Sequence, residues 1–158
     1  MTSDIVIAVV WGIVVAGAGA FLTDLTPWYR ALRRPSWQPP DWLFGPAWTL
    51  ILGLASYSLY LGLRDAQDRD GRLLVTGLFV LNGVLNVLWS PLFFRLRRPD
   101  WALAEVPLLW LSILAPMVLL APVSRPASLL LVPYLAWVSF ATVLNITIVR
   151  LNRPFGGR

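Results

Sequence analysis

Residues 5–23 read IVIAVVWGIVVAGAGAFLT, an apolar run without a charged side chain. A helix needs about 20 apolar residues to cross the hydrocarbon core of a bilayer, which is about 30 Å thick. Four similar runs follow at 42–63, 73–94, 101–121 and 127–149. No basic residue precedes the first run, so we expect it to remain as a membrane span rather than a cleaved signal peptide. The sequence predicts an all-α, integral membrane bundle of five transmembrane helices, forming one domain over residues 1–158.

The composition supports this class of protein. Of the 158 residues, 58% are hydrophobic and 13% are charged, whereas about a quarter of the residues of a soluble domain are charged. The chain has no cysteine, histidine or lysine. Disulfides, thiolate metal sites, the most common general base and the Schiff-base nucleophile are therefore excluded. We expect no catalytic residues, no metal site and no enzymatic activity of an ordinary soluble kind.

The basic residues indicate how the helices are oriented. All 13 are arginines and stand in short clusters between the apolar runs, a distribution typical of membrane proteins rather than of nucleic-acid binding. Nine of them fall in 24–41, 95–100 and the C-terminal tail, and four fall in 64–72 and at Arg125. In a bacterial cytoplasmic membrane this asymmetry predicts the N-terminus outside and the C-terminus inside.

Three of the spans carry small or polar residues at a spacing of four. The stripe Ala8, Gly12, Ala16 and Ala20 would let a second helix approach closely, either within the bundle or across a homodimer interface. Asn82, Asn86 and Ser90 would either bond neighbouring helices together or line a ligand cavity, and the two interpretations are compatible. Trp137, Ala141 and Asn145 would form a wall with a recess. We expect Pro91 to bend its helix near the end.

The tryptophans fall into two groups by their depth in the spans. Trp48, Trp89 and Trp137 lie deep enough to be cavity residues. Trp11, Trp42 and Trp101 are interpreted as anchors at the membrane interface. Glu105, about one turn into its span, is interpreted as an interfacial acid paired with Arg97 or Arg98.

The segment 24–41 is rich in tryptophan, proline and arginine, which is unusual for a loop. It reads DLTPWYRALRRPSWQPPD. Prolines stiffen it, and the aromatic side chains give it an apolar body. It is either an aromatic belt at the membrane surface or a lid over the mouth of the bundle.

Four motifs together resemble the tryptophan-rich sensory protein family, also called the translocator protein or peripheral benzodiazepine receptor family. They are Trp28-Tyr29 with RPSWQPP after it, PAWT at 46–49, LNVLWSPLFF at 85–94, and VPYLAW at 132–137. The resemblance covers nearly the whole chain. It implies a bundle of five helices, commonly a homodimer, whose cavity is closed by the first loop and binds porphyrins and benzodiazepine-type ligands.

Carried over by position, the ligand-binding residues would be Trp28, Tyr29, Trp48, Asn82, Asn86, Ser90, Trp137, Ala141, Leu144 and Asn145. Neither histidine nor cysteine is present as an axial ligand for haem. No cofactor is therefore required, and porphyrin would be a ligand held by aromatic rings, amides and arginines.

Three functions remain open on these grounds. The first is a membrane receptor, sensor or carrier for tetrapyrroles. The second is an enzyme that degrades porphyrin under light, using the excited porphyrin and oxygen. The third is a structural dimer whose cavity holds membrane lipid. The aromatic walls and amides, without an acid, base or metal, favour the first.

Overall fold

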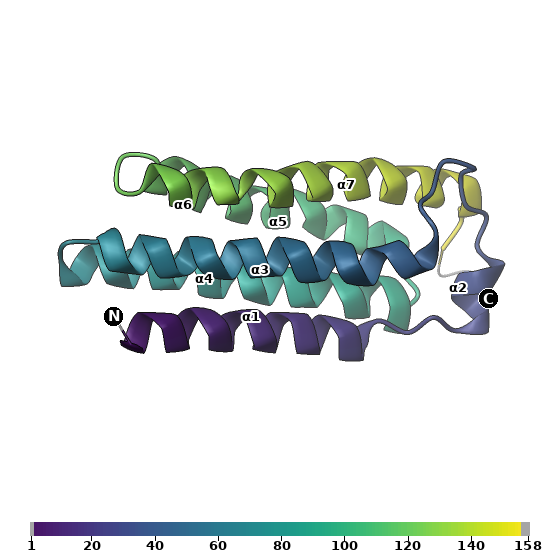
Figure 1. Cartoon of the computed structure of the whole chain (residues 1–158). Helices are drawn as coiled ribbons and strands as arrows, with labels where there is room; N and C mark the ends of the chain where they lie inside the picture. The colour runs from purple at the N-terminus through teal and green to yellow at the C-terminus, as the bar shows by residue number, and fades with distance from the viewer. Residues whose placement is uncertain (1, 156–158) are drawn as a thin grey trace.

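The computed structural model describes residues 2–155, and all the regular structure in that range is helical. Five helical segments are long and apolar enough to cross a membrane, so the predicted membrane bundle of five helices is confirmed. They are α1 (Thr2–Leu22), α3 (Asp41–Asp65), α4 (Arg69–Ser90) continued by η1 (Pro91–Arg95), α5 (Pro99–Leu120), and α6 (Arg125–Leu130) followed by α7 (Val132–Asn152). The short helix α2 (Pro27–Ala31) lies in the connection between α1 and α3 (Figure 1).

The outward faces of the long helices are apolar. Phe21 on α1 is 77% exposed and Leu50 on α3 is 65% exposed, and exposed leucines and valines also occur on α4, α5 and α7. Contiguous apolar surface of this extent is rare on a soluble monomer. Lipid tails are as apolar as these side chains, so the surface can face the hydrocarbon core of a bilayer. The helices also satisfy their own backbone hydrogen bonds, as a membrane requires.

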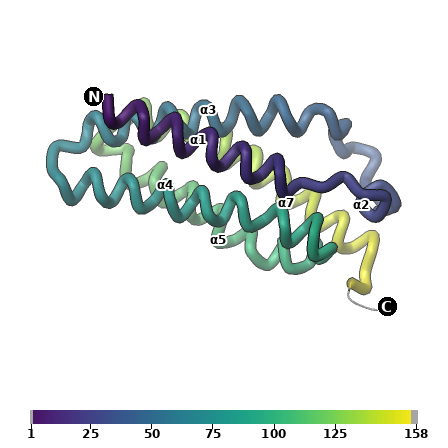
Figure 2. Tube along the Cα trace, turned by 90° about the horizontal axis from the view of Figure 1, so that it is seen from below, coloured from purple at the N-terminus to yellow at the C-terminus, as the bar shows by residue number. Residues whose placement is uncertain are grey.

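The helices pack side by side along their length. α1 packs against α3 and α4, α4 packs against α5, α5 packs against α7, and α3 packs against α6. The N-terminus and the end of α7 lie at opposite ends of the bundle (Figure 1). In Figure 2 the connection that contains α2 lies at the end of the bundle where α7 ends. An odd number of spans requires this separation of the termini.

Two prolines interrupt the regular helices. Proline has no N–H to donate, and its ring clashes with the carbonyl four residues earlier. At Pro91, α4 gives way to the wider turn η1, in which the Leu96 N–H donates to the Pro91 carbonyl at 2.9 Å. The expected irregularity is confirmed there. The fifth predicted span, 127–149, corresponds to the membrane-crossing segment Arg125–Asn152, within which a turn at Leu131, two residues before Pro133, separates α6 from α7.

The small-residue stripe on α1 is divided between two environments. Ala8 is buried, and a Cβ added at Gly12 would lie 2.1 Å from the Ser56 Oγ on α3. Ala16 and Ala20 are exposed. The N-terminal half of the stripe therefore packs inside the bundle, and only the C-terminal half is free to contact another molecule.

Trp11 does not lie in an interfacial belt, and that interpretation was wrong. Its ring is buried against Phe79 on α4, with ring centres 5.5 Å apart, and its Nε1 donates to the Phe79 carbonyl at 2.7 Å. Trp42 and Trp101 are exposed, as expected of interfacial anchors. The position of Trp11 along its predicted span did not reveal which face of α1 packs against α4.

The interior differs between the two ends of the bundle. We call the end near the 66–68 connection the far half, where Leu59, Leu63, Val75 and Leu120 form an aliphatic core. We call the end near α2 the loop-side half. There the partly buried Trp48, Trp89 and Trp137 pack against the main core. A second cluster lies against the loop and consists of Tyr29, Phe93, Phe94, Ala102, Leu144 and Ile148.

Candidate ligand-binding site

Three aromatic rings meet between α3 and α7 in the loop-side half. The Trp48 ring centre lies 6.0 Å from that of Tyr134 and 6.4 Å from that of Trp137, and both pairs are nearly perpendicular. Phe44, one turn before Trp48, contacts Trp137 in the same edge-to-face manner at 5.7 Å. Such pairs contribute about 0.5–1.5 kcal/mol each beyond the area that they bury. Trp48 and Trp137, each expected as a cavity residue, contact one another across two helices, and we call Trp48, Tyr134 and Trp137 the ring cluster.

The two amides of α4 have different roles. Asn86 donates from Nδ2 to the Tyr134 hydroxyl at 2.8 Å, which connects α4 to the ring cluster. Asn82, one turn earlier, is buried and donates to the Ser112 Oγ on α5 at 3.0 Å. Asn82 therefore bonds two helices together, whereas Asn86 borders the rings.

The remaining predicted residues on α4 and α7 lie closer to the loop. Ser90 is buried, and its Oγ is 3.5 Å from the Thr23 Oγ1. Asn145 is buried against the start of α5, where its amide donates to the Pro99 carbonyl at 3.1 Å and accepts from the Leu103 N–H at 3.3 Å. Leu144 packs in the cluster under the loop, and Ala141 is half-buried one turn beyond Trp137. The structure does not place Ser90, Leu144 or Asn145 in the ring cluster.

The loop over this end is held by Tyr29. Its ring is buried against Phe93 and Phe94, and its hydroxyl donates to the Asp41 Oδ1 at 2.9 Å. Burial of the phenol, together with the nearby Asp41 carboxylate, raises the pKa of Tyr29 above its ordinary value of 10.0. Arg34 pairs with Asp41 at 3.1 Å, and its guanidinium lies 5.1 Å from the centre of the Tyr29 ring.

The same loop also reaches α7. Asn152 accepts from the Arg33 N–H and donates to the Arg33 carbonyl, both at 2.8 Å. Trp37 contacts Phe140 with ring centres 6.0 Å apart, and Trp28 contacts Phe93 at 6.3 Å. The segment 24–41 is thus attached to α3, η1 and α7 at once. This arrangement favours a lid over a simple surface belt.

Within the spanning helices of residues 2–155, two residues have buried side-chain polar atoms without a hydrogen-bond partner. They are Glu105 on α5, through both carboxyl oxygens, and Trp137 on α7, through Nε1. The expected pairing of Glu105 with Arg97 or Arg98 was wrong. Arg97 is exposed, and Arg98 donates to the Asp100 carboxylate from Nε at 2.8 Å. Glu105 is only 7% exposed and points into the bundle instead of toward its surface.

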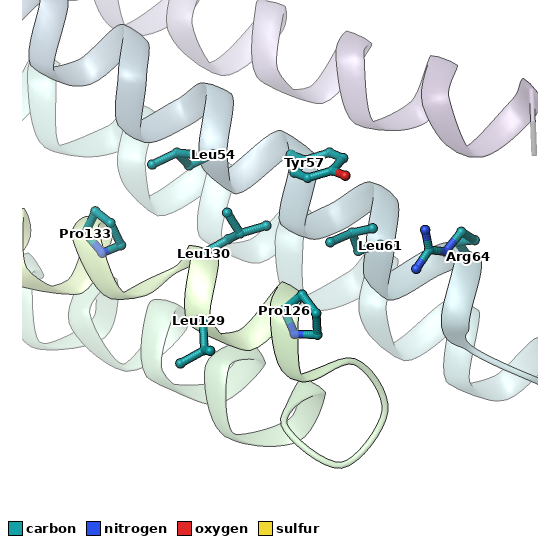
Figure 3. Close-up of a pocket in the computed structure, with 8 residues that line it drawn as sticks. All are labelled: Leu54, Tyr57, Leu61, Arg64, Pro126, Leu129, Leu130 and Pro133. Atoms are coloured by element: carbon teal, nitrogen blue, oxygen red, sulfur yellow. The ribbon is translucent and has the colours of Figure 1, made fainter.

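Two grooves lie away from the ring cluster. One, of about 470 Å³, runs along the outer side of α3 beside α6 and the start of α7, where Leu61, Leu129 and Leu130 lead toward Arg64 (Figure 3). The other, of about 350 Å³, adjoins the 66–68 connection. Neither includes a predicted ligand-binding residue. At the ring cluster the rings contact one another, so a ligand would have to separate them.

Sequence reasoning did not identify Phe44, Tyr134 or Glu105 as site residues. Tyr134 stands three residues before Trp137, which places both on one face of α7, and this spacing was a usable signal. Phe44 stands four residues before Trp48 on α3. Nothing in the spacing of Glu105 distinguished a surface acid from one that faces the interior.

Comparison with known proteins agrees with this architecture. The sequence pattern of the TspO/MBR family matches residues 5–151. The chain is similar to the tryptophan-rich protein TspO of Chlorobaculum tepidum, with 44% identity over 125 residues, or 79% of each chain. It is 38% identical to the human translocator protein over 133 residues, 83% of this chain and 79% of that one. It is also 38% identical to the tryptophan-rich sensory protein of Cereibacter sphaeroides over 138 residues, 87% of this chain and 84% of that one. With its five membrane-spanning helices, the chain therefore belongs to the TspO/MBR family.

Proposed function

We propose that the protein is a membrane receptor or sensor that binds a flat hydrophobic ligand, porphyrin above all, beside the ring cluster. The observation that carries this proposal is the group formed by Trp48, Tyr134 and Trp137, with the Asn86 amide at its edge and the Trp137 Nε1 unpartnered. Mostly apolar walls with a few polar groups are typical of small-molecule sites. A planar ligand that entered between these rings would separate them. The aromatic side chains would then stack on the faces of the ligand instead of contacting one another.

The lid supports the same proposal. Tyr29 and Trp28 cover the loop-side half, and several hydrogen bonds that hold their loop, such as those between Arg33 and Asn152, are exposed. A loop held in this way opens at a lower free energy than a packed helix. We propose that the ligand enters through this end, and that benzodiazepine-type molecules use the same route.

A porphyrin titration followed by tryptophan fluorescence tests the proposal. We expect Trp48→Ala and Trp137→Ala each to weaken protoporphyrin binding about 2- to 12-fold through lost stacking alone, and further through lost contact area. Trp42→Ala is the matched control, because Trp42 is 72% exposed. Equal affinities in the three variants would place porphyrin on the outer surface and contradict the proposal.

Light-dependent degradation of porphyrin is the second candidate function. Trp48 and Trp137 present two oxidisable indoles to the same space, and one of them has a free N–H. The absorbance of bound protoporphyrin under illumination, with and without protein, distinguishes the two functions. Protein-dependent bleaching that is lost in Trp137→Ala would favour the enzyme, and bleaching at the rate of free porphyrin would favour the receptor.

We further propose a homodimer in a bacterial cytoplasmic membrane, with the loop-side end inside. Nine of the 13 arginines belong to connections or tails at that end. Reporter fusions to the two termini test the orientation. An N-terminus on the cytoplasmic side would contradict it.

A further inference from the structure

Glu105 is a carboxyl group in the interior of a membrane bundle, and no other residue in residues 2–155 hydrogen-bonds to it. A carboxyl in this position is costly, so ionisable residues inside membrane spans pair with a partner or mark a ligand path. The chain offers no lysine or histidine as a partner. The nearest arginine along α5, Arg98, is bound to Asp100 and lies over the Trp101 ring, 4.4 Å from its centre.

The carboxyl lies on the buried face of α5. In the same half of the bundle, the Tyr134 hydroxyl accepts a hydrogen bond from Asn86 and the Tyr134 ring contacts Trp48. Along α5, Glu105 lies three residues after Ala102 of the cluster under the loop and four before Leu109 of the main core. Glu105 therefore faces the bundle interior from the wall formed by α5, and the rings of Trp48 and Trp137 lie on the walls formed by α3 and α7.

A ligand between these walls meets aromatic faces on one side and a hydrogen-bond acceptor on the other. Indole and phenol rings attract cations through their faces, most strongly where water is excluded. A carboxylate in the same low-dielectric space attracts a protonated nitrogen and accepts its hydrogen. Both features select the same kind of ligand, a flat aromatic molecule with a positively charged N–H group.

We propose that Glu105 is a ligand-binding residue that accepts an N–H group of a protonated aromatic amine held against Trp48, Tyr134 and Trp137. This inference rests on the proposed function, because it requires the ligand to lie beside the ring cluster. It adds a preference among flat ligands, which stacking alone does not provide.

The test uses two ligands with the same three-ring plate, 9-aminoacridine and acridine, at pH 7.5. The first is a cation with N–H donors, and the second is uncharged. We expect Glu105→Gln to weaken 9-aminoacridine binding about 10- to 100-fold, the range of a charge-assisted hydrogen bond, and to leave acridine binding unchanged. Asp70→Asn is the matched control, since it removes the same charge from an exposed position at the opposite end of the bundle and should change neither affinity.

Two other results would overturn the inference. An equal loss for both ligands would show that Glu105 only maintains the fold, and no loss for either would show that the carboxyl is protonated and inactive in binding. Trp137→Ala separates these failures from a failure of the proposed function, because it should weaken both ligands if they occupy the ring cluster. If neither ligand responds to Trp137→Ala, the proposed site itself is wrong.

A measurement on the unmodified protein covers the case in which Glu105→Gln does not fold. Dicyclohexylcarbodiimide labels carboxyl groups in apolar surroundings, and mass spectrometry locates the label. We expect labelling at Glu105 that saturating 9-aminoacridine suppresses at least fivefold and that saturating acridine suppresses much less. Equal labelling with and without 9-aminoacridine would contradict the proposal.

Discussion

Within the spanning helices of residues 2–155, the buried polar side chains without a hydrogen-bond partner lie in the loop-side half of the bundle and not in the far half. In the far half, Ser58 donates to the Ala127 carbonyl at 2.7 Å and Ser128 donates to the Met117 carbonyl, so these hydroxyls connect helices. In the loop-side half, Glu105 and the Trp137 Nε1 have no partner. A buried polar group without a partner costs about 1–3 kcal/mol. This difference supports the proposal that the far half stabilises the fold and that the loop-side half binds a ligand.

The largest expected effect is on stability, from a change in the far half. Leu59 is 1% exposed within the aliphatic core. Leu59→Ala should lower the free energy of unfolding by about 2–5 kcal/mol, because it removes buried methyl groups and leaves a cavity. Thermal unfolding in detergent measures this loss. The protein that remains folded should bind protoporphyrin with unchanged affinity, and a parallel loss of affinity would break the distinction between the halves.

A second pair of variants separates packing inside the bundle from dimer formation. Gly12→Leu should destabilise the monomer by about 1–3 kcal/mol, because its Cβ would collide with the Ser56 Oγ. Ala16→Leu lies on an exposed part of the same helix and should leave monomer stability unchanged. Sedimentation and thermal unfolding of both variants distinguish the two effects. If the dimer dissociates in Ala16→Leu, its interface lies on α1. If the Ala16→Leu monomer is destabilised instead, this face of α1 packs inside the bundle.

A smaller effect is expected at the lid. Tyr29→Phe removes the hydrogen bond to Asp41 and keeps the ring contacts with Phe93 and Phe94. We expect the closed loop to lose about 1 kcal/mol, so bound protoporphyrin should leave about fivefold faster, as measured by stopped-flow fluorescence. Gln38→Ala, which removes a longer contact of 3.4 Å to the same hydroxyl, should change the release rate less. An unchanged release rate in Tyr29→Phe would show that the hydrogen bond does not hold the lid.

The smallest effect concerns pH. The closed loop raises the pKa of Tyr29 above 10.0, so its closed form binds the phenol proton more tightly than its open form does. The phenol proton of Tyr29 therefore stabilises the closed loop fully below pH 10. This stabilisation is lost as the pH rises through the raised pKa of Tyr29 in the closed form. Release of protoporphyrin should therefore accelerate above pH 10 in the unmodified protein but not in Tyr29→Phe. The same acceleration in both proteins would assign it to another group.

The sequence predicted the elements of this fold better than the contacts between them. Runs of apolar residues located the five spans because length and hydropathy alone determine whether a helix can cross a bilayer. The first run, predicted at 5–23, corresponds to α1 at Thr2–Leu22, and the second, at 42–63, corresponds to α3 at Asp41–Asp65. The turn at Leu131, two residues before Pro133, was not predicted. Proline alone does not locate such a turn, because Pro107 and Pro116 stand inside α5 without ending it.

For the site, the aromatic side chains were predicted more reliably than the polar ones. Trp48 and Trp137 were both selected as candidate site residues, each through its own motif, and their rings are in contact. Asn82 bonds a neighbouring helix, one of the two compatible roles expected of it, and Asn145 bonds the start of α5. Glu105 faces inward rather than toward an arginine. Which face of a helix meets its neighbour depends on the rotation of each helix in the bundle, and apolar runs on all sides do not encode that rotation.

The indole N–H signals of the nine tryptophans test the central claim most directly, because a porphyrin ring strongly shifts the resonance of any proton near its face. On addition of protoporphyrin, we predict that the Trp48 and Trp137 signals shift most. The Trp11 signal, whose N–H is bonded to the Phe79 carbonyl, should stay in place. Shifts confined to the exposed Trp42 and Trp101, with Trp48 and Trp137 unchanged, would contradict a binding site in the loop-side half.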